Sequence, residues 1–174
     1  QTLARIRTTT NYADLAMVDL VIEAATENQA IKEKILAQVD QVVSPQAIIA
    51  SNTSSISITH LGSLNSRPER FIGIHFFNPP PLMALIEVIM GKQTSPETLK
   101  AVLVMATRMG KEPITVQSSP GFVVNRILLP MINEAFFVLH EGIASPEDID
   151  TGMKLGCKDR KSTRLNSSHT DISR

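Results

Sequence analysis

Two short apolar runs rich in Val and Ile flank an amphipathic stretch, and this pattern limits the fold more than any other feature of the chain. The runs are DLVIEA at 19–24 and AIIAS at 47–51, a length typical of strands buried on both faces of a parallel sheet. The stretch between them carries apolar residues at helical spacing: Ile31, Ile35, Val39 and Val42. Parallel strands need a crossover connection between them, so the pattern over residues 19–51 predicts a β-α-β unit whose helix ends before Pro45.

The rest of the chain divides into a further α/β part and a helical part. In order, the patterns predict a helix at 58–64, strands at 71–77 and 85–90, a helix at 96–109, a strand at 113–117, a long helix at 122–141 and a helix that starts at Ser145 and ends before Gly156. We therefore predict the latter part of an α/β sheet domain at 1–117 and the start of a helical domain at 118–157.

Composition excludes several classes of protein. The 174 residues are 43% hydrophobic, and 17 Lys and Arg balance 17 Asp and Glu, so we expect a globular chain without nucleic-acid or membrane partners. The single cysteine, Cys157, forms no internal disulfide, which favours a reducing, cytoplasmic location. We expect no metal, because no metal-ligand spacing occurs among Cys157, His60, His140 and His169. The polar segment 158–174 has few large apolar residues and predicts a disordered tail.

His75 and Glu87 are the first candidates for chemistry. Each lies inside an apolar predicted strand, and the two strands follow one another in the sequence. Paired side by side, the carboxylate would orient the imidazole and raise the basicity of its free nitrogen, which makes a general base. The alternative is a core histidine bonded to the backbone, with Glu87 exposed at a strand edge.

Other polar residues cluster where strands end. The segment SNTSS at 51–55 directly follows a predicted strand, where ligands of open α/β sheets bind; helix capping is the alternative. Glu27 and Lys32 lie around the turn after the first predicted strand and the start of the following helix. They are either ligand contacts or exposed charges at a helix start. Asn125 lies near the start of the long helix, where its amide either meets a ligand or caps the helix.

Five motifs in order resemble one family. VIEAATEN, ASNTSS, RFIGIHFFNP with LIEVIMG, PGFVVNR and EDIDTGMKLG are similar to the L-3-hydroxyacyl-CoA dehydrogenases, and ILLPMINEA most resembles their 3-hydroxybutyryl-CoA type. The resemblance covers about 5–156. It implies an α/β fold: a partial Rossmann-type NAD-binding domain that lacks its first β-α unit, followed by the start of an all-helical C-terminal domain.

The resemblance also implies an activity and a site. Family members oxidise the 3-hydroxyl of an acyl-CoA with NAD+. The implied catalytic residues are the general base His75, its orienting carboxylate Glu87, and Ser54 and Asn125 on the substrate oxygens. The implied cofactor-side residues are Glu27, Lys32, Ser54 and Asn78, with Lys32 also near the CoA moiety. An acyl-CoA substrate and a homodimeric parent enzyme follow from the same resemblance.

Some expectations concern the ends of the chain. The family's glycine-rich phosphate turn would precede Gln1, so we expect these 174 residues alone to bind NAD+ poorly and to turn over little. Residues 158–174 match nothing in the family and are predicted to be non-native. The alternatives are a related dehydrogenase of a non-thioester 3-hydroxy acid and an inactive binding or structural homologue.

Overall fold

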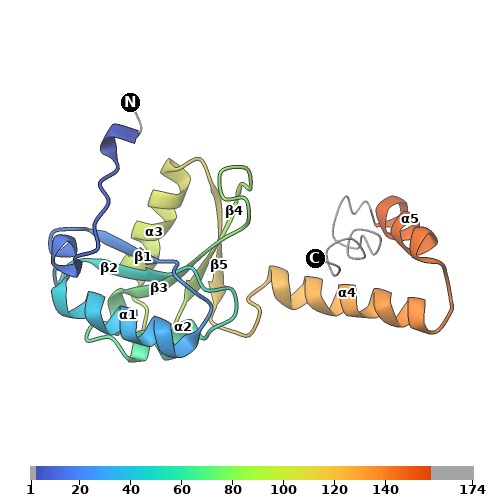
Figure 1. Ribbon diagram of the computed structural model, residues 1–174, viewed down its shortest axis with the longest axis horizontal. Helices are drawn as coiled ribbons and strands as arrows, with labels where there is room; N and C mark the ends of the chain where they lie inside the picture. The colour runs from blue at the N-terminus through green and yellow to red at the C-terminus, as the bar shows by residue number, and fades with distance from the viewer. Residues whose placement is uncertain (1–2, 158–174) are drawn as a thin grey trace. The chain divides into compact units, whose positions relative to one another are not determined.

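The structure is a computed structural model that describes residues 3–157. The chain divides after Phe122 into two compact units, which are described separately. The tail predicted at 158–174 lies outside the described residues, and the domain boundaries predicted at 117 and 157 stay predictions. Figure 1 shows a sheet with helices in the first unit and helices without a sheet in the described part of the second.

A five-stranded mixed sheet forms the frame of the first unit. Its strands lie in sequence order: β1 (Leu20–Glu23), β2 (Ile48–Ser51), β3 (Phe71–Phe76), β4 (Leu85–Met90) and β5 (Glu112–Gln117). β1, β2 and β3 are parallel, β4 is antiparallel to β3, and β5 is parallel to β4. The predicted strands and the β-α-β unit are therefore confirmed, with bounds that differ by at most one residue.

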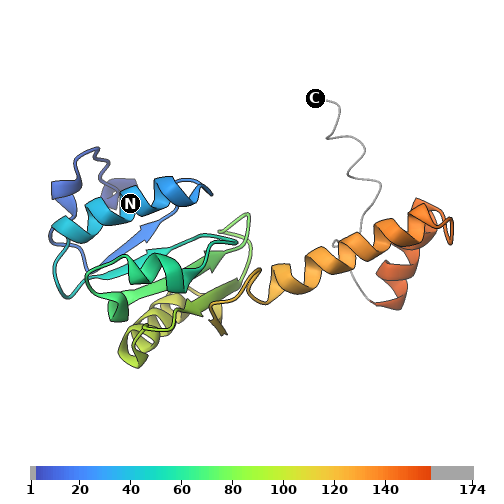
Figure 2. The same ribbon diagram turned by 90° about the horizontal axis from the view of Figure 1, so that it is seen from below.

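Helices cover both faces of this sheet (Figure 2). The first unit contains α1 (Gln29–Val42), α2 (Ile58–Ser63), α3 (Pro96–Arg108) and the short 3-10 turns η1 (Leu3–Arg5), η2 (Tyr12–Leu15) and η3 (Pro68–Arg70). One apolar cluster joins α1 and α2 to one sheet face, and another joins α3 to the opposite face. Side chains alternate between faces along a strand, so His75 and Gly73 share the α2 face with Phe71, while Ile72 and Ile74 pack on the α3 side.

The buried face of α1 differs from the predicted one. Ile31 is 46% exposed, whereas Lys32, Leu36 and Val39 are buried. Asn28 caps the helix by accepting a hydrogen bond from the Ile31 backbone at 3.1 Å, and the first turn then places Lys32 against the end of β1. The apolar spacing was a correct guide to the helix but a wrong guide to its first buried residue, because a buried carboxylate on β1 takes the ammonium of Lys32.

The second unit consists of α4 (Val124–His140) and α5 (Pro146–Gly156). Ala135 and Ile149 form its small buried cluster, joined by partly buried Val138, Leu139 and Ala144. Ser145 caps α5, since its side chain accepts a hydrogen bond from the Asp148 backbone at 3.1 Å. Both predicted helices are confirmed. Among the described residues, no helix has the length and apolar character needed to cross a membrane.

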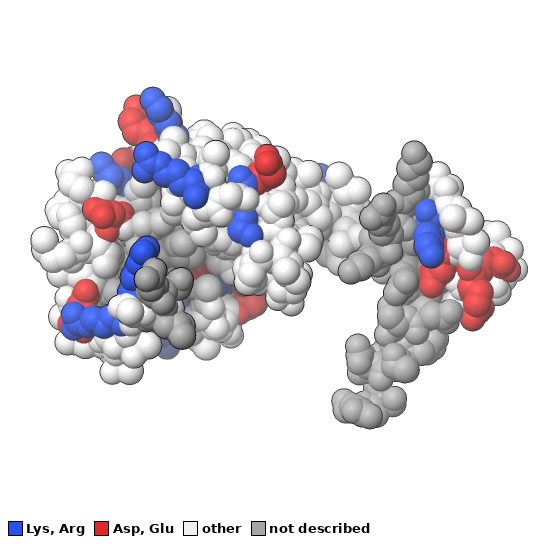
Figure 3. Space-filling view, turned by 90° about the horizontal axis from the view of Figure 1, so that it is seen from above, with Lys and Arg blue, Asp and Glu red and all other residues white. Residues whose placement is uncertain are grey.

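Charged side chains do not segregate by sign on the face shown in Figure 3, where basic and acidic groups both occur over the first unit. Surface charge on this face therefore does not mark a ligand site, and the expected position of such a site comes from the topology of the sheet. β1, β2 and β3 all end at one edge, and in open α/β sheets this carboxyl edge is where ligands bind.

Candidate active site

His75 and Glu87 face each other across two paired strands. The antiparallel register of β3 and β4 pairs His75 directly with Glu87, and His75 Nδ1 lies 2.8 Å from Glu87 Oε2. His75 is 5% exposed and Glu87 is fully buried. The predicted pairing of the two side chains is confirmed. The alternative of a glutamate exposed at a strand edge is wrong, because β5 covers that side of β4.

Ser54 extends this pair into a chain of three side chains. It lies in the loop after β2, and its Oγ is 3.1 Å from His75 Nε2. A carboxylate oxygen accepts hydrogen bonds, so the imidazole proton lies on Nδ1 and Nε2 accepts from the Ser54 hydroxyl. The ring centroids of Phe77 and Phe122 lie 4.7 and 5.7 Å from that of His75. The imidazole is thus held on both nitrogens and enclosed by aromatic rings, with its one accepting nitrogen aimed at the carboxyl edge.

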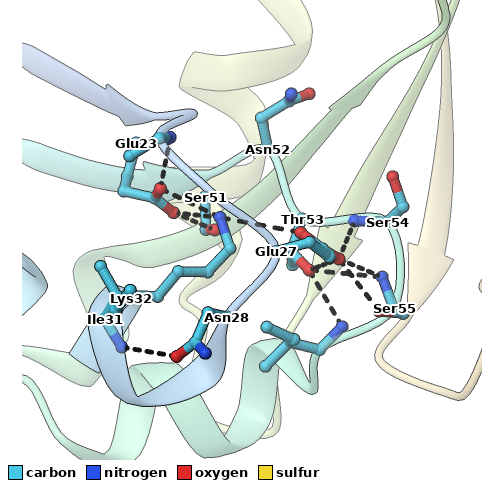
Figure 4. Close-up of polar contacts among 12 residues, drawn as sticks. Glu23, Glu27, Asn28, Ile31, Lys32, Ser51, Asn52, Thr53, Ser54 and Ser55 are labelled. Atoms are coloured by element: carbon cyan, nitrogen blue, oxygen red, sulfur yellow. Dashed lines mark hydrogen bonds and ion pairs between the residues drawn. The ribbon is translucent and has the colours of Figure 1, made fainter.

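Glu27 holds the loop that carries Ser54. Its Oε1 accepts four hydrogen bonds, from Thr53 Oγ1 at 2.6 Å, Ser54 N at 2.9 Å, Ser55 N at 3.0 Å and Ser55 Oγ at 2.9 Å. Figure 4 shows the loop curled around this carboxylate. Burial raises the pKa of Glu27, but these hydrogen bonds outweigh it and hold the pKa below its usual value. The side chain of Glu27 is 45% exposed, as the alternative of an exposed charge at a helix start predicts, but it is not free, because four hydrogen bonds hold it to the serine loop.

A buried ion pair adjoins Glu27. Lys32 Nζ lies 2.7 and 3.0 Å from the two carboxylate oxygens of Glu23 at the end of β1. The Glu23 carboxylate also accepts from Ser51 Oγ at 2.8 Å and from the Ala25 backbone at 2.7 Å. Burial raises the pKa of Glu23, and the hydrogen bonds from Lys32, Ala25 and Ser51 more than compensate, so the pKa lies below its usual value.

Glu23 is the residue that the sequence interpretation missed. A glutamate at the end of an apolar strand, nine positions before a lysine near a helix start, was the available signal. The same logic singled out Glu87, but a strand end is commonly exposed, and the burial of Glu23 depends on Lys32. The alternative of an exposed Lys32 is wrong, since its side chain is 2% exposed.

The remaining predicted residues lie on other elements. Asn78 is exposed in the loop after β3, and Asn125 is half-buried in the first turn of α4, in the second unit. Asn52, next to the site serines, is used structurally, since its Oδ1 accepts from the Phe76 backbone at 2.9 Å. Among the residues that the structure describes, no group of three His, Cys, Asp or Glu side chains is arranged to hold a metal.

Comparison with known proteins decides the family. The model described as "3-hydroxyacyl-CoA dehydrogenase, NAD binding domain" matches residues 1–119, and "3-hydroxyacyl-CoA dehydrogenase, C-terminal domain" matches 121–161. The chain belongs to the 3-hydroxyacyl-CoA dehydrogenase family. The resemblance inferred from the motifs is thus confirmed, and with it the NAD-binding α/β fold followed by a helical unit.

Relatives within this family are similar over most of the chain. A probable 3-hydroxybutyryl-CoA dehydrogenase of Deinococcus radiodurans is 54% identical over 154 residues, which are 88% of this chain and 55% of the relative. The crystal structure of (S)-3-hydroxybutyryl-CoA dehydrogenase from Ralstonia eutropha is 62% identical, with a TM-score of 0.90 over 92% of this chain and 57% of that one. The fatty acid oxidation complex subunit alpha of Acinetobacter baylyi is 50% identical over 88% of this chain and 21% of the relative.

The chain therefore spans about half the length of the curated relatives named 3-hydroxybutyryl-CoA dehydrogenase. The Ser54–His75–Glu87 chain lies within the segment that matches the NAD-binding domain, and Asn125 lies within the C-terminal match.

Proposed function

We propose that this chain carries the general-base centre of an NAD-dependent enzyme that interconverts (S)-3-hydroxyacyl-CoA and 3-oxoacyl-CoA, with 3-hydroxybutyryl-CoA as the substrate. The observation that carries the proposal is the hydrogen-bonded chain Ser54 Oγ–His75 Nε2 and His75 Nδ1–Glu87 Oε2, at 3.1 and 2.8 Å. The names of relatives at about 50% identity support the substrate.

The roles of the three side chains follow from their chemistry. An alcohol becomes a ketone only as its hydroxyl proton is removed, so a base must reach that oxygen. His75 Nε2 is the accepting nitrogen and takes this proton, while Glu87 stabilises the resulting imidazolium. The Ser54 hydroxyl donates to the same substrate oxygen and limits the charge that builds on it. Asn125 on α4 is the proposed donor of a hydrogen bond to the thioester carbonyl.

The residues at the carboxyl edge fit the nicotinamide end of NAD. The parallel strands β1, β2 and β3 end there, and the loop after β2 presents neutral hydroxyls beside His75, a donor set suited to an amide and a ribose. NAD+ supplies the hydride acceptor when bound. Glu27, Lys32, Ser54 and Asn78 are the proposed cofactor-side residues. Since the ammonium of Lys32 is buried on Glu23, its part is to place Glu27 and the serine loop.

Loss of the base tests the proposal. In the full-length protein, His75→Ala and Glu87→Gln are expected to lower kcat for acetoacetyl-CoA reduction, followed by NADH absorbance, by about 10²–10⁴-fold. His60→Ala is the matched control: His60 is a half-exposed histidine that contacts Glu33 at 2.8 Å, outside the site, and its variant keeps normal turnover. Near-normal activity of His75→Ala, with unchanged circular dichroism, would remove His75 from this role.

The same assay separates the substrate classes. A CoA thioester reduced well above the free 3-oxo acid supports the proposal, whereas the opposite order would assign a dehydrogenase of non-thioester acids. We further propose a cytoplasmic homodimer without nucleic-acid or membrane partners. Exposed apolar residues of the second unit, such as Ile127 at 64%, Leu129 at 61% and Phe137 at 50%, support the dimer.

A further inference from the structure

Glu23 and Lys32 form a buried ion pair that the proposed proton transfer does not use. The side chains of Lys32 and Glu23 are 2% and 1% exposed, and both oxygens of Glu23 lie within 3.0 Å of the ammonium. Ser51 Oγ and the Ala25 backbone complete the shell of the carboxylate. Figure 4 shows the pair beside the connection that leads from β1 to α1.

Such a pair fixes its members in place. Burial of two charges is tolerated only when each charge keeps its partner and its remaining hydrogen bonds, which offset the free-energy cost of removing them from water. Glu23 on β1 and Lys32 on α1 therefore lock the first turn of α1 to the end of β1, and Ser51 adds the end of β2. The position of the Lys32 ammonium is set by the Glu23 carboxylate.

This ammonium connects the pair to the site. Lys32 Nζ lies 3.8 Å from Glu27 Oε2, while Glu27 Oε1 accepts from the backbone of Ser54 at 2.9 Å. Ser54 Oγ in turn contacts His75 at 3.1 Å. One continuous series of charged and hydrogen-bonded contacts thus runs from the end of β1 to the imidazole.

We infer that Glu23 is a positioning residue of this enzyme: by holding the ammonium of Lys32, it sets the Glu27 carboxylate that fixes Ser54 against His75. The inference rests on the proposed function. Without the Glu23 charge, nothing holds the ammonium at this distance from Glu27, its other carboxylate neighbour. The Glu27 carboxylate then loses the fixed charge that orients it toward the backbone N–H groups of Ser54 and Ser55, and the serine hydroxyl is displaced.

The test uses Glu23→Gln in the full-length protein, assayed with acetoacetyl-CoA at saturating NADH. A displacement of about 1 Å at a reacting group costs up to about 100-fold in rate, so we expect kcat to fall at least about tenfold while KM for the thioester changes less than about threefold. Glu33→Gln is the matched control: this carboxylate lies on α1, next to Lys32 in the sequence, and pairs with His60 at the surface. Its kcat is expected to stay within about twofold.

The double variant Glu23→Gln/Lys32→Met separates positioning from stability, and it carries the test if the single variant does not fold. Both buried charges are then absent, so thermal stability is expected to return toward that of the unaltered protein, whereas kcat stays low because nothing sets Glu27. Recovery of kcat together with stability would overturn the inference, as would a folded Glu23→Gln variant with kcat within about twofold of the unaltered protein. If the unaltered protein itself does not reduce acetoacetyl-CoA, the proposed function fails and the inference falls with it.

Discussion

Gly73 lets helix α2 approach the sheet beside the site, and its replacement by alanine is the sharpest test of this packing. Gly73 lies on β3 two residues before His75, on the same face of the strand. A Cβ built there would lie 2.8 and 2.9 Å from Cγ1 and Cδ1 of Ile58 on α2, and 2.9 Å from Cβ of Ile89 on β4. All three distances are shorter than ordinary van der Waals contact, which begins at 3.4 Å.

The magnitude follows from what must move. Ile58 and Ile89 are fully buried. Relief at Ile58 requires α2 to move away from the sheet by about 0.5 Å or Ile58 to leave its rotamer, and relief at Ile89, the β4 residue paired with Gly73, requires the two strands to shift. Overpacking of this kind costs about 1–3 kcal/mol, which we expect as the loss in free energy of unfolding for Gly73→Ala. Because α2 follows the loop that carries Ser54, the separation also lengthens the Ser54–His75 contact, and kcat falls.

Urea unfolding followed by far-ultraviolet circular dichroism measures this change, since the chain has no tryptophan for fluorescence. Gly62→Ala is the control within the same contact. Its Cβ would lie 3.1 Å from Cδ1 of Phe71 and 3.5 Å from Cβ and Cγ of the same side chain. Alanine in α2 regains up to about 1 kcal/mol of helix propensity, so the net effect is expected near zero. A Gly73→Ala variant within about 0.5 kcal/mol of the unaltered protein would refute the packing argument.

Two further predictions concern stability. The carboxyls of Glu23, Glu27 and Asp40 have folded-state pKa values below their usual 4.5, 4.5 and 3.8. In acid the unfolded chain therefore binds more protons than the folded chain, and the free energy of unfolding falls as the pH drops below about 4.5. Urea unfolding at pH 3 to 7 measures this dependence, and a free energy of unfolding that does not change with pH would contradict it. Ser95→Ala removes the cap that accepts from the Thr98 backbone at 3.1 Å and is expected to destabilise by about 1 kcal/mol, with Ser95→Asn restoring it.

Local sequence patterns were sufficient to predict the strands and helices and one contact of the candidate site. Continuous apolar runs predicted β1 to β4 because a strand buried on both faces needs apolar residues throughout, and Ser95-Pro96-Glu97 predicted the start of α3 because it satisfies a helix N-terminus. The pairing of His75 with Glu87 was predictable because two polar residues inside adjacent apolar strands need each other.

The sequence by itself determined the family, the order of strands and helices, and the pairing of His75 with Glu87, since these depend on motifs and on burial patterns along single strands and helices. Only the tertiary structure decided that β4 runs antiparallel to β3, that Lys32 rather than Ile31 is buried on α1, and that Glu27 accepts four hydrogen bonds from the serine loop. These features depend on groups that are distant in the chain. A charge is buried only where a partner from another element meets it, and no spacing along one helix or strand records that meeting.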